Sequence, residues 1–264
     1  MPPAVARAQS IWVPIDHQMH ARVEWWHPHL AGASGITALS GARYFSATFP
    51  VGERVAFAFE LPFARARMPA TVTTPAYADA SMGNWYVGLQ VGDALEPTAV
   101  VGEIGARLSA TSDDAFLSTT VGMIGDPERF EAFLPSAASL SAAANIIAHR
   151  GSTMARLRFG MTALAYSGSG TGDGSHMLID YGLMASRDID RLRIAGAVIG
   201  RAATLNEGPF GDRASHVATG TASLSLGAFR PSVSLRLPFE QSMRRISPWT
   251  LGVGVDITPR GKRC

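Results

Sequence analysis

The sequence predicts an all-β protein: a single antiparallel transmembrane β-barrel of about twelve strands, with short periplasmic turns and longer external loops. Three observations predict it. Apolar residues alternate with small or polar ones at a period of two, the links between alternating segments are short and long in turn, and charged residues avoid one face of the segments. Strands that cross a bilayer with one face toward lipid have this pattern.

The composition narrows the class of protein. Of 264 residues, 47% are hydrophobic but only 17% are charged, below the roughly 25% of ordinary soluble domains. Lys262 is the only lysine, and the arginines are scattered, so a nucleic-acid partner is not expected. The one cysteine, Cys264, excludes a disulfide within the chain and a cysteine zinc site. We predict no cofactor.

The strands follow from the alternation. Within residues 53–63, the odd positions from Val55 to Phe63 are all large and apolar, whereas the even positions are polar or small. Most of the predicted strands have about 11 to 14 residues, enough to cross a bilayer at a tilt. The twelve predicted strands are 20–30, 37–49, 53–65, 83–93, 99–110, 137–148, 153–166, 176–187, 191–203, 215–226, 229–239 and 248–258.

The links alternate in length. Tight links such as 50–52, 149–152 and 188–190 alternate with long ones, of which 111–136 is the longest. An even number of strands returns both ends of the chain to the periplasmic side. We therefore expect one barrel domain over 20–258. Residues 1–19 are expected to be a signal-peptide remnant or a plug, and residues 259–264 a C-terminal tail.

Charge falls on one face of the strands. The face predicted to point outward carries none from residue 53 onward, as in Leu157, Phe159 and Met161. Nine arginines and four acids fall on the opposite face, a net of +5 that favours anions modestly. The alternative is that arginines pair with the acids across the interior and close it. The predicted lumen-lining residues are Arg54, Glu60, Glu103, Arg107, Arg156, Arg158, Asp180, Arg191, Arg193, Arg201, Arg230, Arg236 and Asp256.

Aromatic residues near strand ends are typical of the girdles at the two membrane interfaces. Strands 20–30 and 37–49 are less regular, because Arg43 shares its parity with Phe45 and Phe49, which a bulge or a shift of register would explain. The predicted girdle residues are Trp25, Trp26, Tyr44, Phe63, Trp85, Tyr166, Phe229, Phe239 and Trp249.

Three short segments carry a family resemblance. Residues 59–63 (FELPF), 83–89 (GNWYVGL) and 235–239 (LRLPF) resemble the outer-membrane barrels associated with the meta-pathway of phenol degradation. The resemblance covers most of residues 37–258 and implies transport of small, often aromatic or hydrophobic molecules across the outer membrane. In one respect the chain departs from bacterial barrels, which usually end on an aromatic residue that the assembly machinery reads. Here the chain continues past Ile257.

Histidines and a glycine-rich run are further candidates for a chemical site. His27 and His29 lie two apart and would project from one face of a strand, which makes them weak candidate metal ligands, although Pro28 disturbs the strand. Ser175-His176 and Ser215-His216 suggest a lipid hydrolase, because some hydrolases of the outer membrane place Ser and His on neighbouring strands, but no Gly-x-Ser-x-Gly turn occurs. The glycine-rich run 168–174 lacks the lysine of a phosphate-binding loop and is predicted to be an external loop.

The long link 111–136 is the candidate constriction or gate, because its segment Arg129, Phe130, Glu131 and Phe133 has the character of a short amphipathic helix. An external cap over the rim is the alternative. We expect a non-enzymatic channel of the bacterial outer membrane that passes small solutes, with outer-membrane lipids and the barrel assembly machinery as partners. The alternatives are a structural or surface-interaction barrel without an open pore, a soluble ligand-binding barrel and a lipid hydrolase.

Overall fold

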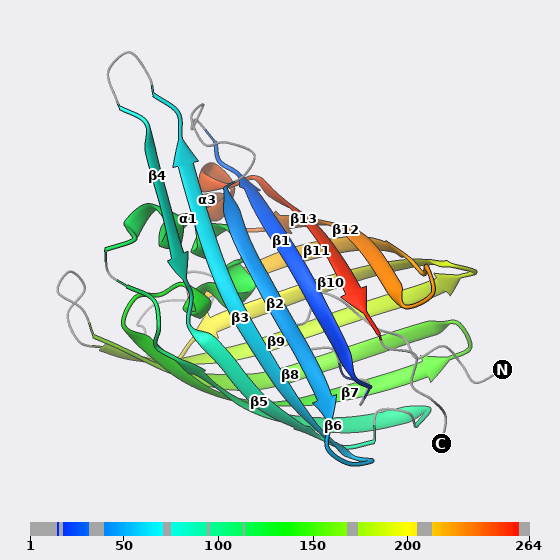
Figure 1. Ribbon diagram of the computed structural model, residues 1–264. Helices are drawn as coiled ribbons and strands as arrows, with labels where there is room; N and C mark the ends of the chain where they lie inside the picture. The colour runs from blue at the N-terminus through cyan, green and yellow to red at the C-terminus, as the bar shows by residue number, and fades with distance from the viewer. Residues whose placement is uncertain are drawn as a thin grey trace.

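The computed structural model describes residues 15, 18–31, 40–70, 75–93, 96–112, 114–167, 174–204 and 213–258, and these form a closed β-barrel (Figure 1). In the described residues, no helix has both the length and the apolar character needed to cross a bilayer. The elements in chain order are β1 (His20–His29), β2 (Gly41–Pro50), β3 (Val55–Met68), β4 (Tyr77–Met82), β5 (Trp85–Val91), β6 (Thr98–Leu108), α1 (Phe116–Gly125), the 3-10 helix η1 (Pro127–Ala132), β7 (Ala137–Arg150), β8 (Thr153–Tyr166), β9 (Gly174–Ile189), β10 (Leu192–Ala203), β11 (Ala214–Leu224), β12 (Phe229–Pro238), α3 (Gln241–Ile246) and β13 (Trp249–Ile257).

Every strand pairs antiparallel with its neighbours, and β1 closes the barrel by pairing with both β2 and β13. Segments β4 and β5 both pair with β3 and follow one another along it, so together they make one strand of the wall. The wall therefore has twelve strands, which confirms the predicted fold class. The predicted strand boundaries differ from the observed ones by a few residues.

The sequence analysis missed β4, which falls in the predicted link 66–82. Its six residues, Tyr77 to Met82, consist mainly of Ala, Ser and Asp and have weak strand propensity. Pairing with the long strand β3 holds them extended, and this hairpin rises beyond the rim of the barrel (Figure 1).

The two ends of the barrel differ in their links. Strands β7 and β8 are joined by Gly151 and Ser152 alone, and β9 and β10 by Asp190 and Arg191. At the opposite end, the link from β6 to β7 contains α1 and η1, and that from β12 to β13 contains α3. We name these the turn end and the loop end. Short turns at one end and longer loops at the other are typical of outer-membrane barrels.

The outer surface is apolar. Large side chains such as Leu157, Phe159 and Leu183 alternate with buried residues and are about half exposed. Apolar surface of this extent is unfavourable in water, at about 25 cal/mol per Å², and is covered when lipid surrounds the barrel. The exterior therefore fits the hydrocarbon core of a bilayer.

Aromatic residues mark both edges of this surface, among them Phe63 and Trp85 toward the loop end and Phe229 at the turn end. Two of the predicted girdle residues were assigned to the wrong face. Trp26 and Tyr44 are buried inside the barrel, because β1 and β2 turn their even-numbered residues inward.

No bulge or shift of register occurs at Arg43. Strands β2 and β3 pair residue by residue from Gly41 and Arg65 to Pro50 and Ala56. Arg43 lies opposite Phe63 and faces outward with Phe45 and Phe49. The predicted conflict disappears because Arg43 stands near the loop end of its strand, where the outward face leaves the apolar region.

Candidate functional site

The inside of the barrel holds a balanced set of charges. Among the described residues, eight arginines and eight carboxylates are buried, a net charge of zero. These are Arg22, Glu24, Glu60, Glu103, Arg107, Asp126, Glu128, Arg129, Glu131, Arg156, Arg158, Asp180, Arg193, Arg201, Arg236 and Asp256. The predicted excess of +5 was therefore wrong for the buried set.

The predicted net charge was too high for two reasons: it included arginines that are not buried, and it left out buried acids. Arg54 and Arg191 lie in exposed turns, and Arg230 is half-buried near the turn end, where it donates to the hydroxyl of Ser225. The sequence analysis also missed Arg22 and Glu24 in β1, and Asp126 and Glu128 in the long link. The inward parity of β1 was the signal that would have found Arg22 and Glu24.

After β6 the chain turns into the barrel, forms α1 and η1, and returns to the wall at β7. We call residues 109–136 the inner loop; residue 113 lies outside the described part. Helix α1 buries Ser118, Thr119, Val121 and Gly122 and leaves Phe116 75% exposed. Its buried face packs on β1 to β4, and Figure 1 shows α1 beside β4 and β3.

Phe133 completes the small apolar core of the inner loop. Its ring is fully buried and meets the ring of Tyr44 edge-on, with 5.8 Å between centroids. A Cβ at Gly122 would lie 2.6 Å from this ring, so only glycine leaves space for it. Trp26, Ala42, Ala64 and Ala132 belong to the same cluster.

Arg129 is the centre of the ion-pair network. Its Nη1 lies 2.6 Å from a carboxylate oxygen of Glu60 and 3.2 Å from one of Glu24, and its Nη2 lies 2.6 Å from Asp126. The guanidinium also stacks on Tyr44, 3.5 Å from the ring centroid. One side chain of the inner loop thus joins β1, β2 and β3.

Arginines of β10 and β12 hold the carboxylates of the inner loop. Arg201 in β10 lies 2.6 Å from Glu131, while Arg236 in β12 lies 2.7 Å from Asp126 and 3.3 Å from Glu128. Thr219 in β11 donates to Glu128 at 3.3 Å. Because β10 lies across the barrel from β1 to β3, whereas only β13 separates β12 from β1, the inner loop contacts both its near wall and the wall opposite.

Asn84 fixes the inner loop to the wall at the break between β4 and β5. Its amide donates to the carbonyls of Glu131 and Leu134, each at 2.8 Å. Its carbonyl accepts from the backbone N–H of Ala110 and Thr111 at 2.9 and 3.0 Å. All four hydrogen bonds are made in a side chain with no exposed surface, so Asn84 holds both ends of the inner loop.

Gly83 gives a first prediction. A Cβ at this position would lie 2.3 Å from the carbonyl oxygen of Ala132 and 2.8 Å from Pro62. We expect Gly83→Ala to displace the inner loop and lower the thermal unfolding temperature of the barrel, because backbone on the opposing side cannot move aside cheaply. Unfolding can be followed by heat-modified mobility on gels. Gly220→Ala, where a Cβ meets nothing within 4 Å, is the control; an equal effect of both changes would contradict the prediction.

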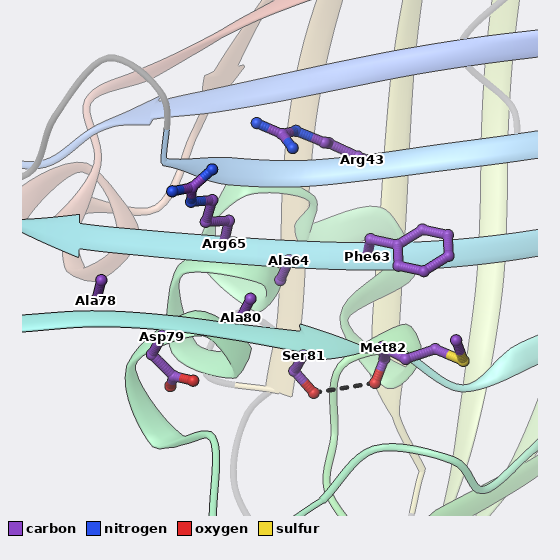
Figure 2. A pocket seen from close by; sticks show the side chains of 9 residues that line it. All are labelled: Arg43, Phe63, Ala64, Arg65, Ala78, Asp79, Ala80, Ser81 and Met82. Carbon is purple, nitrogen blue, oxygen red and sulfur yellow. Dashed lines mark hydrogen bonds between the residues drawn. The ribbon is translucent and has the colours of Figure 1, made fainter.

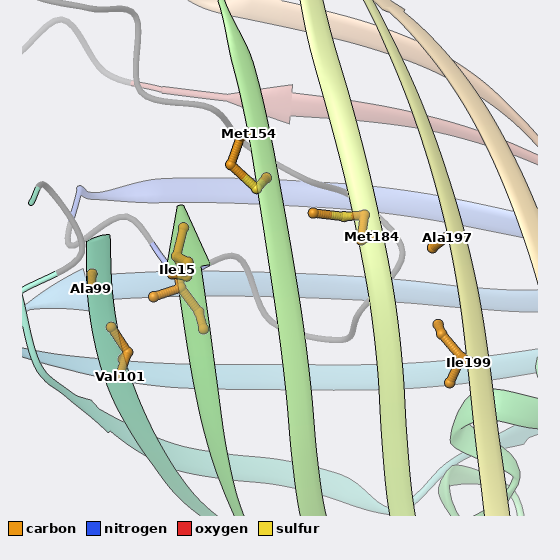
Figure 3. Close-up of a cluster of buried hydrophobic side chains, with 8 residues drawn as sticks. Ile15, Ala99, Val101, Met154, Met184, Ala197 and Ile199 are labelled. Carbon is orange, nitrogen blue, oxygen red and sulfur yellow. The ribbon is translucent and has the colours of Figure 1, made fainter. Parts of the chain in front are cut away.

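The half of the interior toward the turn end has a different character. Glu103 pairs with Arg156 at 3.2 Å and with Arg158 at 3.1 Å, and Arg193 pairs with Asp188 at 2.6 Å. Beside them lies an apolar cluster (Figure 3), made of Ile15, Ala99, Val101, Ile147, Met154, Met184, Ala197 and Ile199. Ile15 is the one described member from the predicted N-terminal segment 1–19; residues 1–14, 16 and 17 of that segment lie outside the described residues.

The environment sets the protonation of the inner-loop carboxylates. The pKa of Glu128 is raised to about 7, because burial and the nearby charge of Asp126, which raise it, outweigh Arg236, which lowers it. Burial also acts to raise the pKa of Asp126, but Arg129 and Arg236 outweigh it and hold that pKa below its usual value. Two neighbouring acids therefore shift in opposite directions, because Asp126 contacts two arginines closely and Glu128 contacts one at longer range.

The histidines do not form the predicted sites. In the described part of the chain, no group of three possible ligands surrounds a metal position. His27 Nδ1 lies 2.7 Å from the carbonyl oxygen of Ser40, and His29 stacks on Trp249 at 4.5 Å. His216 is held between Tyr181 and Glu240, and Ser215 points to the opposite face of β11. His176 contacts the Tyr166 hydroxyl. Residues 168–173 of the glycine-rich run lie outside the described residues.

The closed wall of twelve strands, the apolar exterior and the aromatic edges define a β-barrel of the bacterial outer membrane. No family model matches the sequence, and no curated protein matches it. The fold is similar to that of an outer membrane channel from Pseudomonas putida F1, at 12% identity and a TM-score of 0.64, covering 98% of this chain and 100% of that one. It is also similar to the translocator domain of the autotransporter NalP from Neisseria meningitidis, at 13% identity and a TM-score of 0.52, covering 92% and 89%.

Proposed function

We propose that the protein is a gated outer-membrane channel for small solutes, closed by the inner loop and opened when this loop leaves its ion pairs. The observation that carries the proposal is the set of ion pairs that the loop makes around the interior. Its residues pair with Glu24 and Glu60 in β1 and β3, with Arg236 in β12, and with Arg201 in β10 on the far side. A structural barrel would need no separate segment fitted into its interior in this way.

The charges suggest what the open channel would favour. The buried carboxylates of the inner loop outnumber its one buried arginine by two, and the described buried residues of the wall have seven arginines and five acids. With the loop displaced, the wall would carry a net charge of +2. We therefore propose a modest preference for anions. Small aromatic or hydrophobic solutes, which the family resemblance implies, form a second class to test.

Single-channel recording in planar bilayers tests the proposed function. We expect long closed periods and brief discrete openings, with a reversal potential in a KCl gradient that shows anion preference. Folding and insertion are checked by heat-modified mobility and protease protection. Silence from an inserted barrel, both in the wild type and in variants whose inner loop is released, would reject the channel.

A structural or surface-interaction barrel is the second candidate, and the balance of buried charges favours it. Paired arginines and carboxylates stiffen an interior and leave little room for water. This candidate predicts no conductance in any folded variant of the inner loop. The same recordings therefore separate the two functions.

Glu128 predicts how opening depends on pH. Its pKa is about 7 in the docked loop and 4.5 when unperturbed, so its protonation stabilises the docked loop. This contribution is complete below pH 4.5 and is lost as the pH rises through 7. The lowered pKa of Asp126 changes the stability of the docked loop only at more acidic pH. We expect the open probability to rise about tenfold or more between pH 5 and 8, since each pKa unit corresponds to about 1.4 kcal/mol.

Glu128→Gln provides the test of this assignment. The amide resembles the protonated acid, so we expect the variant to stay mainly closed across the same range of pH. Glu53→Gln, in an exposed turn at the other end, should keep the wild-type response. An unchanged pH response in Glu128→Gln would show that another group controls opening.

A further inference from the structure

Three arginines project from the outer surface of β2 and β3 near the loop end. Arg43 lies opposite Phe63, and Arg65 and Arg67 follow on the same face of β3, whose even-numbered residues point inward. Neither Arg65 nor Arg67 is buried. We propose that Arg43 and Arg65 form a binding site for the phosphate group of a lipid in the external leaflet of the membrane, with Arg67 as an outer contact.

The site is a shallow cavity of about 740 Å³ between β2, β3 and β4 (Figure 2). Its lining joins two kinds of side chain. The guanidinium groups of Arg43 and Arg65 lie along one part, and the apolar side chains of Phe63 and Met82 along another. The remaining lining residues are Ala64, Ala78, Asp79, Ala80 and Ser81. A charged head and an acyl chain on one molecule match this combination.

The site lies at the level on the barrel where a lipid headgroup is expected. Phe63 and Trp85 belong to the aromatic edge of the apolar surface, and Arg65 stands two residues beyond Phe63 along β3. At about 3.3 Å per residue, Arg65 lies about 7 Å farther out along the strand. The polar layer on each side of the hydrocarbon core is about 5 to 8 Å deep, so Arg43 and Arg65 span the level of lipid phosphates.

The lining of the cavity contains two arginines and one acid. Asp79, the one acid in the lining, has its Oδ2 turned to the backbone N–H of Ser118 at 3.2 Å. Between residues 25 and 78 the sequence has only two acids, Glu53 and Glu60. Glu53 lies in a turn at the other end, and Glu60 is buried in the interior with Arg107 and Arg129.

The chemistry favours a phosphate among the anionic groups of lipids. A guanidinium donates two parallel hydrogen bonds to a phosphate, and these charge-assisted bonds are stronger than neutral ones. Two arginines on neighbouring strands can hold one phosphomonoester from two sides. The apolar part of the cavity then covers the first carbons of an acyl chain, which a free phosphate cannot supply.

Native mass spectrometry of the full chain, released from detergent with added lipid A, tests the site. We expect retained lipid A adducts on the wild type and an affinity about tenfold or more lower for the double variant Arg43→Gln/Arg65→Gln. The control Arg150→Gln/Arg187→Gln removes two exposed arginines at the turn end. The single variant Arg65→Gln, at an exposed position, should give a smaller loss in the same direction and serves if the double variant fails to fold.

Two further binding measurements, with dephosphorylated lipid A and with inorganic phosphate as a competitor, identify the ligand. Dephosphorylated lipid A should bind as weakly to the wild type as lipid A does to the double variant, and inorganic phosphate should compete poorly. Equal retention by the double variant and its control would overturn the proposal, as would equal binding of the dephosphorylated lipid. Efficient competition by inorganic phosphate would also overturn it, because the acyl chain would then contribute nothing.

Discussion

Replacing Arg129 with methionine is expected to release the inner loop and open the channel. The change keeps much of the side-chain volume but leaves Glu24, Glu60 and Asp126 without their shared partner in a buried site. Removing one partner of a buried ion pair costs about 3–5 kcal/mol. The docked loop should therefore lose a factor on the order of a hundred or more in occupancy, measured as open probability in planar bilayers.

Arg193→Met is the matched control. Arg193 is equally buried and makes a bidentate pair with Asp188, but this pair joins β9 and β10 and does not involve the inner loop. We expect it to lower the thermal stability of the barrel without raising the open probability. If both variants opened to the same extent, general loosening of the barrel would explain the conductance better than release of the loop.

Asn84→Ala is expected to free the inner loop without altering any charge. The substitution leaves two backbone N–H groups and two carbonyls of the loop without their partner. Each unsatisfied buried group costs about 1–3 kcal/mol unless water reaches it. Because water reaches these groups only when the loop moves, we expect frequent openings with the ion preference of the wild type.

Asn145→Ala separates this effect from the loss of any buried amide. Asn145 also has no exposed surface, but it contacts Val101 and Arg156 within the wall. Its replacement should reduce stability and leave the channel mainly closed. A closed, folded Asn84→Ala barrel would show that the ion pairs alone hold the loop.

Alternation along the chain was enough to predict the barrel. In strands such as β8, every second residue from Met154 to Leu164 is buried and the others face outward, so the parity of a residue fixes its face. Trp26 and Tyr44 were misplaced because they were assigned from their position near strand ends, where an aromatic residue suits either a membrane edge or a packed interior. Parity alone would have separated them.

The interior could be predicted only in part. Local sequence indicates which wall residues face inward, such as Arg201 and Arg236, but not what they meet. Glu131 lies 70 positions before Arg201 in the sequence, and only closure of the barrel brings the two together. Asn84 gave no signal, because its role depends on the two ends of a loop that meet it in space.

The thiol reactivity of a cysteine at position 132, recorded together with conductance, tests the gate most directly. Ala132 has no exposed surface in the docked loop, whereas Phe116 in the same loop is 75% exposed. In a background with Cys264→Ser, we predict that a water-soluble thiol reagent modifies Ala132→Cys at a rate that follows the open probability as pH is varied, because buried thiols are inert. The rate for Phe116→Cys should follow only the thiolate fraction of an exposed cysteine as the pH is varied, so the rate for Ala132→Cys is divided by it before comparison with the open probability. Conductance steps from a channel whose Cys at position 132 stays unreactive would contradict the account.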